Sequence, residues 1–502
     1  RSTLFPYTTL FRSKTQMYSS LYANIKNIYA DAAAEAKKIG VPDVLAKLKE
    51  EGRGTFGLTG GVSGCPAPLR DDVLEYTHKE AKAVKGLAGY VEEMRYMVKD
   101  FYGAEYDVCP TATCEAGINV CYTSMFMPPV QGAGDPYRAR YIAPWEKHFH
   151  HQGGYGRPFP PKFKDIIANR GCTAGELGMM GKRQPMLDTL VMPLAGANYD
   201  NHGIQYFPCP LLTGVKGEEN RPVVEEWAAR HASMLSGITS LGYDTPGYGY
   251  GDHDADGTPI LQKVLAETAH KYSVPYVVDC AWGLPFVGHD IRKTGADAIV
   301  YSMDKATGSS ICGLIIGKED IMVNARRAMG FAGNRYGALA SYGKAVSVAF
   351  DPGKEGLLGA LAAMRVLKDK PEIMTKPVDA MYDIIIDEFK ALDPAIKDGF
   401  IFTKSYNSCA VEINYEGTWK DGKMGVPIFS IEDMYGGTNI FQEGIGAMGM
   451  IPTIAYDGNI YVSTGLNTLD DAGNLIEENM RVAIKSLVAL INITSKYAGV
   501  CE

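Results

Sequence analysis

Two residues near the middle of the chain, Asp279 and Lys305, have types and positions that could do covalent chemistry. Asp279 closes a short apolar run at 275–278, and Lys305 lies four residues beyond a second apolar run at 298–301. A lysine amine can form a Schiff base with an aldehyde, and a carboxylate can keep a pyridine nitrogen protonated. The pair therefore predicts a site for pyridoxal 5'-phosphate (PLP), whose protonated ring accepts electrons from a substrate carbanion.

The elements around these residues must bring them to one place. Residues 260–272 have the pattern of an amphipathic helix, and 275–278, 298–301 and 312–316 have the pattern of short buried strands. This alternation predicts an α/β fold with a mostly parallel sheet. Ligands bind beyond the carboxyl ends of the strands in such sheets, where Asp279 and Lys305 would both lie.

Each residue also has an ordinary interpretation. Asp279 could cap a turn, and Lys305 could be a solvated surface lysine. A nicotinamide-dependent dehydrogenase is a further alternative, but it needs the G-x-G-x-x-G pattern between a strand and a helix. Gly247, Gly249 and Gly251 only alternate within a Tyr-rich loop. The order of Asp279 and Lys305 after two neighbouring strands favours the PLP interpretation.

The segment SMDKATGSSICGLIIGKEDIM, which contains Lys305, resembles the lysine region of the bacterial selenocysteine synthase (L-seryl-tRNA selenium transferase) family. That family belongs to the fold-type I PLP enzymes, and its pattern is Ser-Gly-Asp-Lys, small residues and a Gly-Ile/Leu-Ile hairpin. Met303 replaces the glycine here. The resemblance covers about 55–365 and is specific only around 279–318. It implies the PLP-dependent transferase (aspartate aminotransferase-like) fold, with a smaller α+β C-terminal domain.

The resemblance also implies which residues contact the cofactor. Residues 111–117 (TATCEAG) lie where fold-type I enzymes bind the PLP phosphate at a helix N-terminus. An ordinary helix N-cap is the alternative there. The expected cofactor-binding residues are Lys305, Asp279, Ala281, Thr113, Cys114, Glu115, Ser302 and His151.

A histidine-rich stretch, WEKHFHHQGGYGRPFP, follows an apolar strand at 141–143. In fold-type I enzymes a ring after this strand stacks on the pyridine, so His151 or His148 is expected to stack and to move protons. His148, His150 and His151 could instead bind a metal, but no carboxylate set completes such a site, and we expect none. Arg335 and Arg157 are the expected substrate-binding residues, because arginine binds a carboxylate bidentately; a structural salt bridge is the alternative for Arg335.

The chain departs from its relatives in two ways that bear on the substrate. Fold-type I enzymes commonly place a carboxylate-binding arginine in a C-terminal strand, but 459–467 (NIYVSTGLN) contains none. The formal net charge is −8, and no basic tRNA-binding domain is identified before Thr55. We therefore expect a small amino acid or amino sugar acid as substrate, and not nucleic acid.

The expected reaction is β-elimination or β-replacement after Lys305 removes the α-proton, which makes the protein a lyase or transferase. An aminotransferase, racemase or decarboxylase would use the same residues. A true selenocysteinyl-tRNA synthase and a non-catalytic RNA-associated binding protein are further alternatives. A cysteine desulfurase would need a mobile nucleophilic cysteine, and the loop candidate Cys409 has the pattern of a core residue.

The overall composition limits the cellular compartment in which the protein could work. The 502 residues include 10 cysteines with no C-x-x-C pair, which predicts reduced thiols in the cytoplasm. Cys109, Cys114 and Cys121 lack the spacing of known zinc fingers. No apolar run is long enough to span a membrane.

We expect 1–16 to be a non-native tail before Met17, 17–70 a helical arm, 71–350 a large PLP-binding domain and 351–502 a small domain. Fold-type I enzymes are usually dimers, so we expect a homodimer or higher homo-oligomer.

Overall fold

The computed structural model describes residues 20–21, 23–59, 61–62, 65–66, 69–126, 140–144, 156–158, 191–193, 205–209, 217–242, 252–305, 308–330, 347–407, 409–418, 425–426, 440–453, 455–456 and 459–502. At 61–62, 65–66, 156–158, 191–193, 205–208, 348, 416 and 455–456 the description is limited to the backbone.

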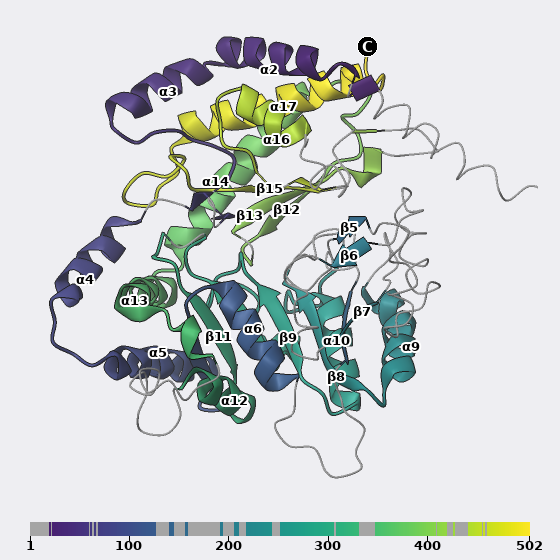
Figure 1. The fold of residues 1–502 in the computed structure, drawn as a ribbon. Helices are drawn as coiled ribbons and strands as arrows, with labels where there is room; N and C mark the ends of the chain where they lie inside the picture. Colours follow the sequence, from purple (N-terminus) through teal and green to yellow (C-terminus); the bar gives the residue numbers. More distant parts are fainter. Residues whose placement is uncertain are drawn as a thin grey trace, which may run out of the picture.

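A seven-stranded sheet in the order β3-β11-β10-β9-β8-β4-β7 forms the centre of the larger part of the molecule (Figure 1). Its strands are β3 (Tyr106–Thr111), β4 (Arg140–Pro144), β7 (Gln205–Cys209), β8 (Leu235–Leu241), β9 (Tyr276–Cys280), β10 (Ala298–Ser302) and β11 (Gly313–Lys318). Strand β11 pairs antiparallel with both of its neighbours, and the other strands run parallel to one another. Six carboxyl ends therefore meet at one edge of the sheet.

Helices cover both faces of this sheet, which explains why its strands are apolar in almost every position. One face packs against α6 (Cys114–Met125) and α12 (Glu319–Met329), whose buried residues join Val277, Val300 and Ile315 in one core. The other core contains alternate strand residues, such as Val278 and Ile299, and most of its helical residues belong to four helices. These helices are α5 (Leu87–Tyr102), α9 (Arg221–His231), α10 (Ile260–Lys271) and α13 (Gly353–Asp369). The shorter helices α4 (Asp71–Ala81) and α11 (Ile291–Thr294) lie beside them.

A four-stranded antiparallel sheet, ordered β12-β13-β15-β14, forms a second layered unit above the first in Figure 1. Its strands are β12 (Ile401–Ser405), β13 (Ala410–Asn414), β14 (Ala455–Tyr456) and β15 (Asn459–Ser463). A separate core joins this sheet to helices from both ends of the chain. They are α2 (Ile25–Ile39), α3 (Val41–Glu50), α14 (Glu372–Glu388), α16 (Ile440–Ala447) and α17 (Glu477–Tyr497). Two further pairs of short antiparallel strands are β1 (Gly61–Val62) with β2 (Cys65–Pro66), and β5 (Gly156–Pro158) with β6 (Val191–Pro193).

The chain after α3 runs along the small sheet before it enters the larger unit. The backbone N–H of Ile451 donates to Phe56 O at 3.0 Å, and that of Ser463 donates to Leu58 O at 3.1 Å. The hydroxyls of Thr59 and Ser463 lie 3.3 Å apart in a buried position. Helix α13 packs in the core of the larger unit, although it follows residue 351. The domain boundaries expected from the sequence stay a prediction.

The predicted α/β class and the mostly parallel sheet are confirmed. The expected strands at 275–278, 298–301 and 312–316 correspond to β9, β10 and β11, and the helix expected at 260–272 corresponds to α10. Within the described residues, every helix is too short or too polar to cross a membrane.

A buried carboxylate at the start of β3 ties the two helical layers to the edge of the sheet. Asp107 is fully buried, and it accepts hydrogen bonds from Arg95 Nε at 2.7 Å and Arg95 Nη2 at 2.8 Å. Arg326 Nη1 also donates to it, from the opposite helical layer. Arg95 belongs to α5 and Arg326 to α12. Removing this carboxylate would leave two nearly buried guanidinium groups short of a partner, and that is costly.

We expect Asp107→Asn to lower the free energy of unfolding by about 3–5 kcal/mol, because Arg95 and Arg326 lose their buried carboxylate and keep only the more exposed Glu92 and Glu319 as partners. Urea unfolding followed by circular dichroism measures this change. Asp100→Asn is the matched control, since Asp100 pairs with Lys368 at the surface, and it should cost less than about 1 kcal/mol. Equal effects of the two substitutions would contradict this account.

Candidate active site

The register of two neighbouring strands places Asp279 and Lys305 at one edge of the large sheet. Asp279 on β9 pairs with Val300 on β10 in parallel, and β10 ends at Ser302, three residues before Lys305. Asp279 is 2% exposed, and its Oδ1 accepts the backbone N–H of Ala281 at 3.2 Å. Asp279 follows Val277 by two residues on the same strand, so its side chain is on the face of the sheet that packs against α6.

The amine of Lys305 is enclosed by protein. The residue is 5% exposed, and its Nζ lies 4.0 Å from Cys114 Sγ and 6.0 Å from the ring centre of Trp282. No ion pair joins this amine to a carboxylate of the residues that the structure describes. An ammonium group in such a position costs free energy unless it is compensated. A buried lysine of this kind at the carboxyl edge of a sheet is a candidate for chemistry with its amine.

The turn that carries Lys305 is held by its own polar side chains. The hydroxyl of Ser302 donates to Asp304 Oδ1, and both residues are buried. Gly308, after the lysine, accepts a hydrogen bond on its carbonyl from the backbone N–H of Arg70 at 3.1 Å. These contacts fix the backbone on both sides of the lysine, so that its amine has a defined place.

Helix α6 directs its N-terminus to the same edge, because it begins just after β3 ends. Thr113 is the N-cap residue, and its Oγ1 accepts the backbone N–H of Ala116 at 3.0 Å. The first N–H groups of a helix have no partner within the helix and, with the helix dipole, favour an anion. The predicted contacts Thr113 and Cys114 therefore lie where a phosphate could be bound.

Strand β11 approaches this helix start so closely that a side chain is excluded. A Cβ added at Gly313 would lie 2.2 Å from Thr113 O and 2.5 Å from Thr111 Oγ1. Both the carbonyl and the hydroxyl belong to the segment that leads into α6. Glycine at 313 thus lets the strand that follows the lysine turn hold the start of α6 in place.

The pKa of the Cys114 thiol depends on the charged groups around it. Burial raises the pKa of Cys114, the charge of Lys305 opposes that rise, and the carboxylates of Asp279 and Asp304 add to it. The thiol is therefore held in its neutral form, so we assign it no nucleophilic role. Cys409, the desulfurase alternative, is 3% exposed, and burial raises the pKa of its thiol as well.

An aromatic pair from both units borders the lysine. The rings of Trp282 and Tyr461 lie 5.2 Å apart, with Trp282 in the loop after β9 and Tyr461 on β15 of the small sheet. Because Trp282 also faces the amine of Lys305, the small sheet contributes to the surroundings of the lysine.

The structure brings six of the predicted residues together, namely Lys305, Asp279, Ala281, Ser302, Thr113 and Cys114. Glu115 lies in the first turn of α6 with an exposed side chain. The side chains of His148, His150, His151, Arg157 and Arg335 lie outside the described residues, as do Gly247, Gly249 and Gly251. Their predicted roles stay predictions.

Sequence reasoning missed Trp282, Asp304, Asn407 and Tyr461. Trp282 and Asp304 lie within three residues of Asp279 and Lys305, so proximity along the chain was an available signal. Asn407 and Tyr461 come from the small sheet, and no local pattern connects them with the lysine.

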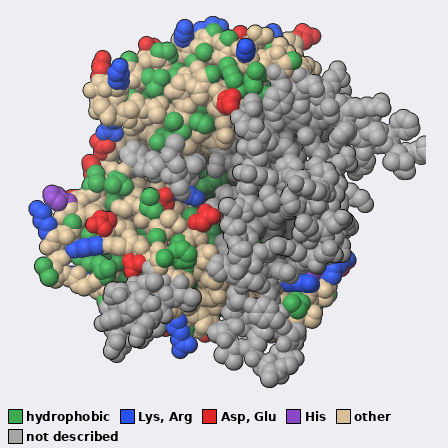
Figure 2. Space-filling view, in the orientation of Figure 1, with side chains coloured by type: hydrophobic (Ala, Val, Ile, Leu, Met, Phe, Trp, Pro, Cys, Tyr) green, Lys and Arg blue, Asp and Glu red, His purple; other side chains and the backbone are tan. Residues whose placement is uncertain are grey.

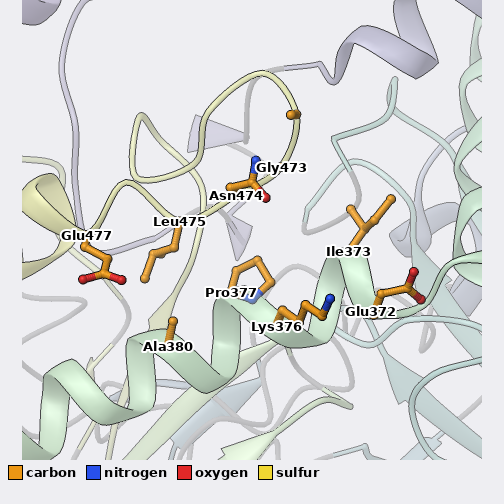
Figure 3. Close-up of a pocket in the computed structure, with 10 residues that line it drawn as sticks. Glu372, Ile373, Lys376, Pro377, Ala380, Gly473, Asn474, Leu475 and Glu477 are labelled. Atoms are coloured by element: carbon orange, nitrogen blue, oxygen red, sulfur yellow. The ribbon is translucent and has the colours of Figure 1, made fainter.

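A separate cavity of 330 Å³ lies between the start of α14 and the loop before α17, and Figure 3 shows its lining. Glu372, Lys376 and Pro377 face it from α14, and Asn474 and Leu475 face it from the loop. None of the predicted site residues lines it. The face of the molecule drawn in Figure 2 is of mixed charge, because acidic and basic side chains are interspersed over its described part. No three His, Cys, Asp or Glu side chains of the described residues are grouped to hold a metal ion.

Comparison with known proteins gives a match in structure but none in sequence. No protein-family model and no curated protein sequence matches the chain. D-glucosaminate-6-phosphate ammonia-lyase is 13% identical over 90% of this chain and 98% of that chain, with a TM-score of 0.46. The SepCysS–SepCysE N-terminal domain complex matches with 11% identity over 87% of this chain and 94% of that chain, with a TM-score of 0.50. An adenosylmethionine-8-amino-7-oxononanoate aminotransferase from Methanocaldococcus jannaschii is 12% identical over 87% of this chain and 89% of that chain, also with a TM-score of 0.50.

The two structures with the higher score bear on the fold and extend over most of the chain. They confirm the fold expected from the lysine region. The chain has the PLP-dependent transferase fold, of the aspartate aminotransferase-like kind.

Proposed function

We propose that this protein is an enzyme that binds PLP through Lys305 and acts on a small amino acid or an amino sugar acid. The observation that carries the proposal is the enclosed amine of Lys305, 5% exposed and without an ion pair among the described residues, beside the strand end that bears Asp279. A lysine kept for structure would normally extend to solvent or pair with a carboxylate.

The residues present fit the three polar parts of the cofactor. The N-terminus of α6, capped by Thr113, suits a phosphate. The buried carboxylate of Asp279 suits a protonated pyridine nitrogen, and the amine of Lys305 suits the aldehyde. The structure matches with a TM-score of 0.50 support the same assignment, because they share the fold.

PLP, when bound, supplies an electron sink for breaking a bond at the α-carbon of an amino compound. Among the residues that the structure describes, the amine of Lys305 is the base best placed to take up and return a proton at that carbon. Asp279 would supply the carboxylate for the pyridine nitrogen, and the ring pair of Trp282 and Tyr461 borders the lysine on the side of the small sheet.

We further propose β-elimination or β-replacement as the reaction, so that the enzyme is a lyase or transferase. An aminotransferase would use the same described residues and is the second candidate. The two are separated by incubating the PLP-loaded protein with single amino acids and amino sugar acids. β-Elimination releases the group on the β-carbon and, after hydrolysis by water, yields ammonia and a 2-oxo acid without any added amino acceptor. β-Replacement needs an added nucleophile, and an aminotransferase turns over continuously only when a 2-oxo acid is supplied.

The assembly and the location are also proposals. A homodimer or higher homo-oligomer would follow from the fold, and light scattering on the purified chain measures the mass directly. The cytoplasmic location rests on the cysteine content of the sequence.

Borohydride reduction of the PLP-loaded protein should fix the cofactor covalently to the peptide that contains Lys305. Mass spectrometry of the digest identifies the site, and Lys305→Ala should carry no label because the reacting amine is gone. Lys318→Ala is the matched control, since Lys318 is the last residue of β11 and pairs with Asp297 at 2.9 Å. A label on another lysine in the wild type would overturn the assignment.

The carboxylate of Asp279 should be needed for turnover but not for attachment of the cofactor. We expect Asp279→Asn to retain the borohydride label at Lys305 and to lose at least about a hundredfold in kcat, because an amide cannot balance a positive charge on the ring. Asp297→Asn is the control, since Asp297 is 8% exposed and precedes β10 at the opposite edge. Wild-type turnover by Asp279→Asn would contradict this role.

The start of α6 should select for the phosphate. Gly313→Ala would push a Cβ against Thr113 O, so we expect it to weaken PLP binding while it leaves the weaker binding of pyridoxal, which has no phosphate, almost unchanged. Equilibrium titration followed by absorbance measures both affinities. Gly446→Ala on α16 is the control, because a Cβ there meets no atom within 4 Å. A parallel loss of affinity for both ligands would argue against a phosphate site at this helix.

A further inference from the structure

Asn407 is a buried residue of the small unit that binds the large unit at three points. It lies in the turn between β12 and β13 and is 2% exposed. Its Oδ1 accepts a hydrogen bond from Cys280 Sγ at 3.1 Å and from the backbone N–H of His289 at 3.0 Å. Its Nδ2 donates to the carbonyl of Gly242. One amide group thus joins the ends of β8 and β9 to the loop that follows β9.

The Asn407 side chain fits between neighbouring segments because several residues that contact it are glycines. A Cβ at Gly283 would lie 2.4 Å from Asn407 O, and a Cβ at Gly288 would lie 2.8 Å from Asn407 Oδ1. Gly242 is similar, since a Cβ there would lie 3.3 Å from Asn407 Nδ2. The amide is therefore held in a fitted space in which its donor and acceptor atoms have fixed partners.

The segment that Asn407 holds is the one that borders Lys305. Residues 280–289 begin directly after Asp279, and they include Ala281, whose N–H binds the Asp279 carboxylate, and Trp282, whose ring faces the lysine amine. The two contacts with Asn407 lie at the start and at the end of this segment. A substitution at position 407 should therefore change the positions of the Asp279 and Trp282 side chains, although Asn407 itself does not contact Lys305.

We propose that Asn407 is a positioning residue of the lysine site, which sets the place of Asp279 and Trp282 relative to Lys305 by fixing 280–289 against the small unit. This inference rests on the proposed function. Without Asn407 the loop should open more readily, because the half-buried backbone N–H of His289 and the buried carbonyl of Gly242 lose this partner. The groups around the bound cofactor, Asp279 and Trp282 among them, should then be less rigidly positioned.

The first experiment needs no cofactor. Hydrogen–deuterium exchange is measured on the PLP-free wild type, on Asn407→Ala and on the control Asn479→Ala. Asn479 is also buried, at 4% exposure, and donates to the carbonyl of Asn467 at 2.7 Å, away from 280–289. We expect Asn407→Ala to speed the exchange of peptides within 281–289 at least about fivefold, and Asn479→Ala to leave them unchanged.

The second experiment measures the circular dichroism of the bound cofactor. Visible circular dichroism is recorded for the same three proteins loaded with PLP, at equal cofactor content by alkaline release. An asymmetric protein surrounding gives the bound cofactor its ellipticity, so Asn407→Ala should change the ellipticity per bound cofactor while Asn479→Ala retains the wild-type signal. If Asn407→Ala does not fold, Asn407→Asp takes its place, since it keeps the acceptor atom and loses the donor to Gly242.

Faster exchange in 281–289 together with a changed ellipticity would support the proposal. Wild-type exchange in that segment would overturn it, and so would faster exchange with a wild-type ellipticity. A wild-type protein that binds no PLP would overturn the proposed function itself, a failure visible before any variant is made.

Discussion

The parallel pairing of β9 with β10 is the interaction on which the candidate site depends. It sets Asp279 opposite Val300, so that a carboxylate at the end of one strand and a lysine just beyond the next come to the same edge. Strand β11 then returns antiparallel between β10 and β3, which brings the end of β3 and the start of α6 to that edge as well. A shift of one residue in β9 would turn the Asp279 side chain to the opposite face of the sheet.

The apolar strands and the polar edge have different costs. Strands β9 and β10 are buried along their whole length, and the cores on both faces stabilise them. At the carboxyl edge the same burial encloses Asp279, Asp304 and Lys305, which costs free energy. Such a cost is expected where enclosed polar groups act on a ligand, because interactions are stronger away from water.

The small sheet takes part in the site through residues far away in the sequence. Tyr461 packs on Trp282, and Asn407 binds the loop that contains it. The chain at 56–59 is hydrogen-bonded to the small sheet before it leads to α4 of the larger unit. Helices α2 and α17, from the two ends of the chain, pack together over the same core (Figure 1). The surroundings of Lys305 therefore depend on the N-terminal and C-terminal segments as well as on the large sheet.

The sequence by itself determined the class of the fold and the pair at its centre. Short apolar runs followed by Asp279 and Lys305 were sufficient, because strands buried on both faces are apolar throughout and polar residues mark where they end. The helix N-terminus expected at 111–117 followed from the family resemblance, and the structure has Thr113 as the N-cap residue of α6. Only the tertiary structure decided that Trp282, Tyr461 and Asn407 belong to the same region. Their contacts join segments separated by more than a hundred residues, and pairing between two sheets leaves no periodic signal along the chain. The enclosure of the Lys305 amine is likewise a property of packing, because the sequence shows a lysine in a polar turn and gives no measure of what covers it.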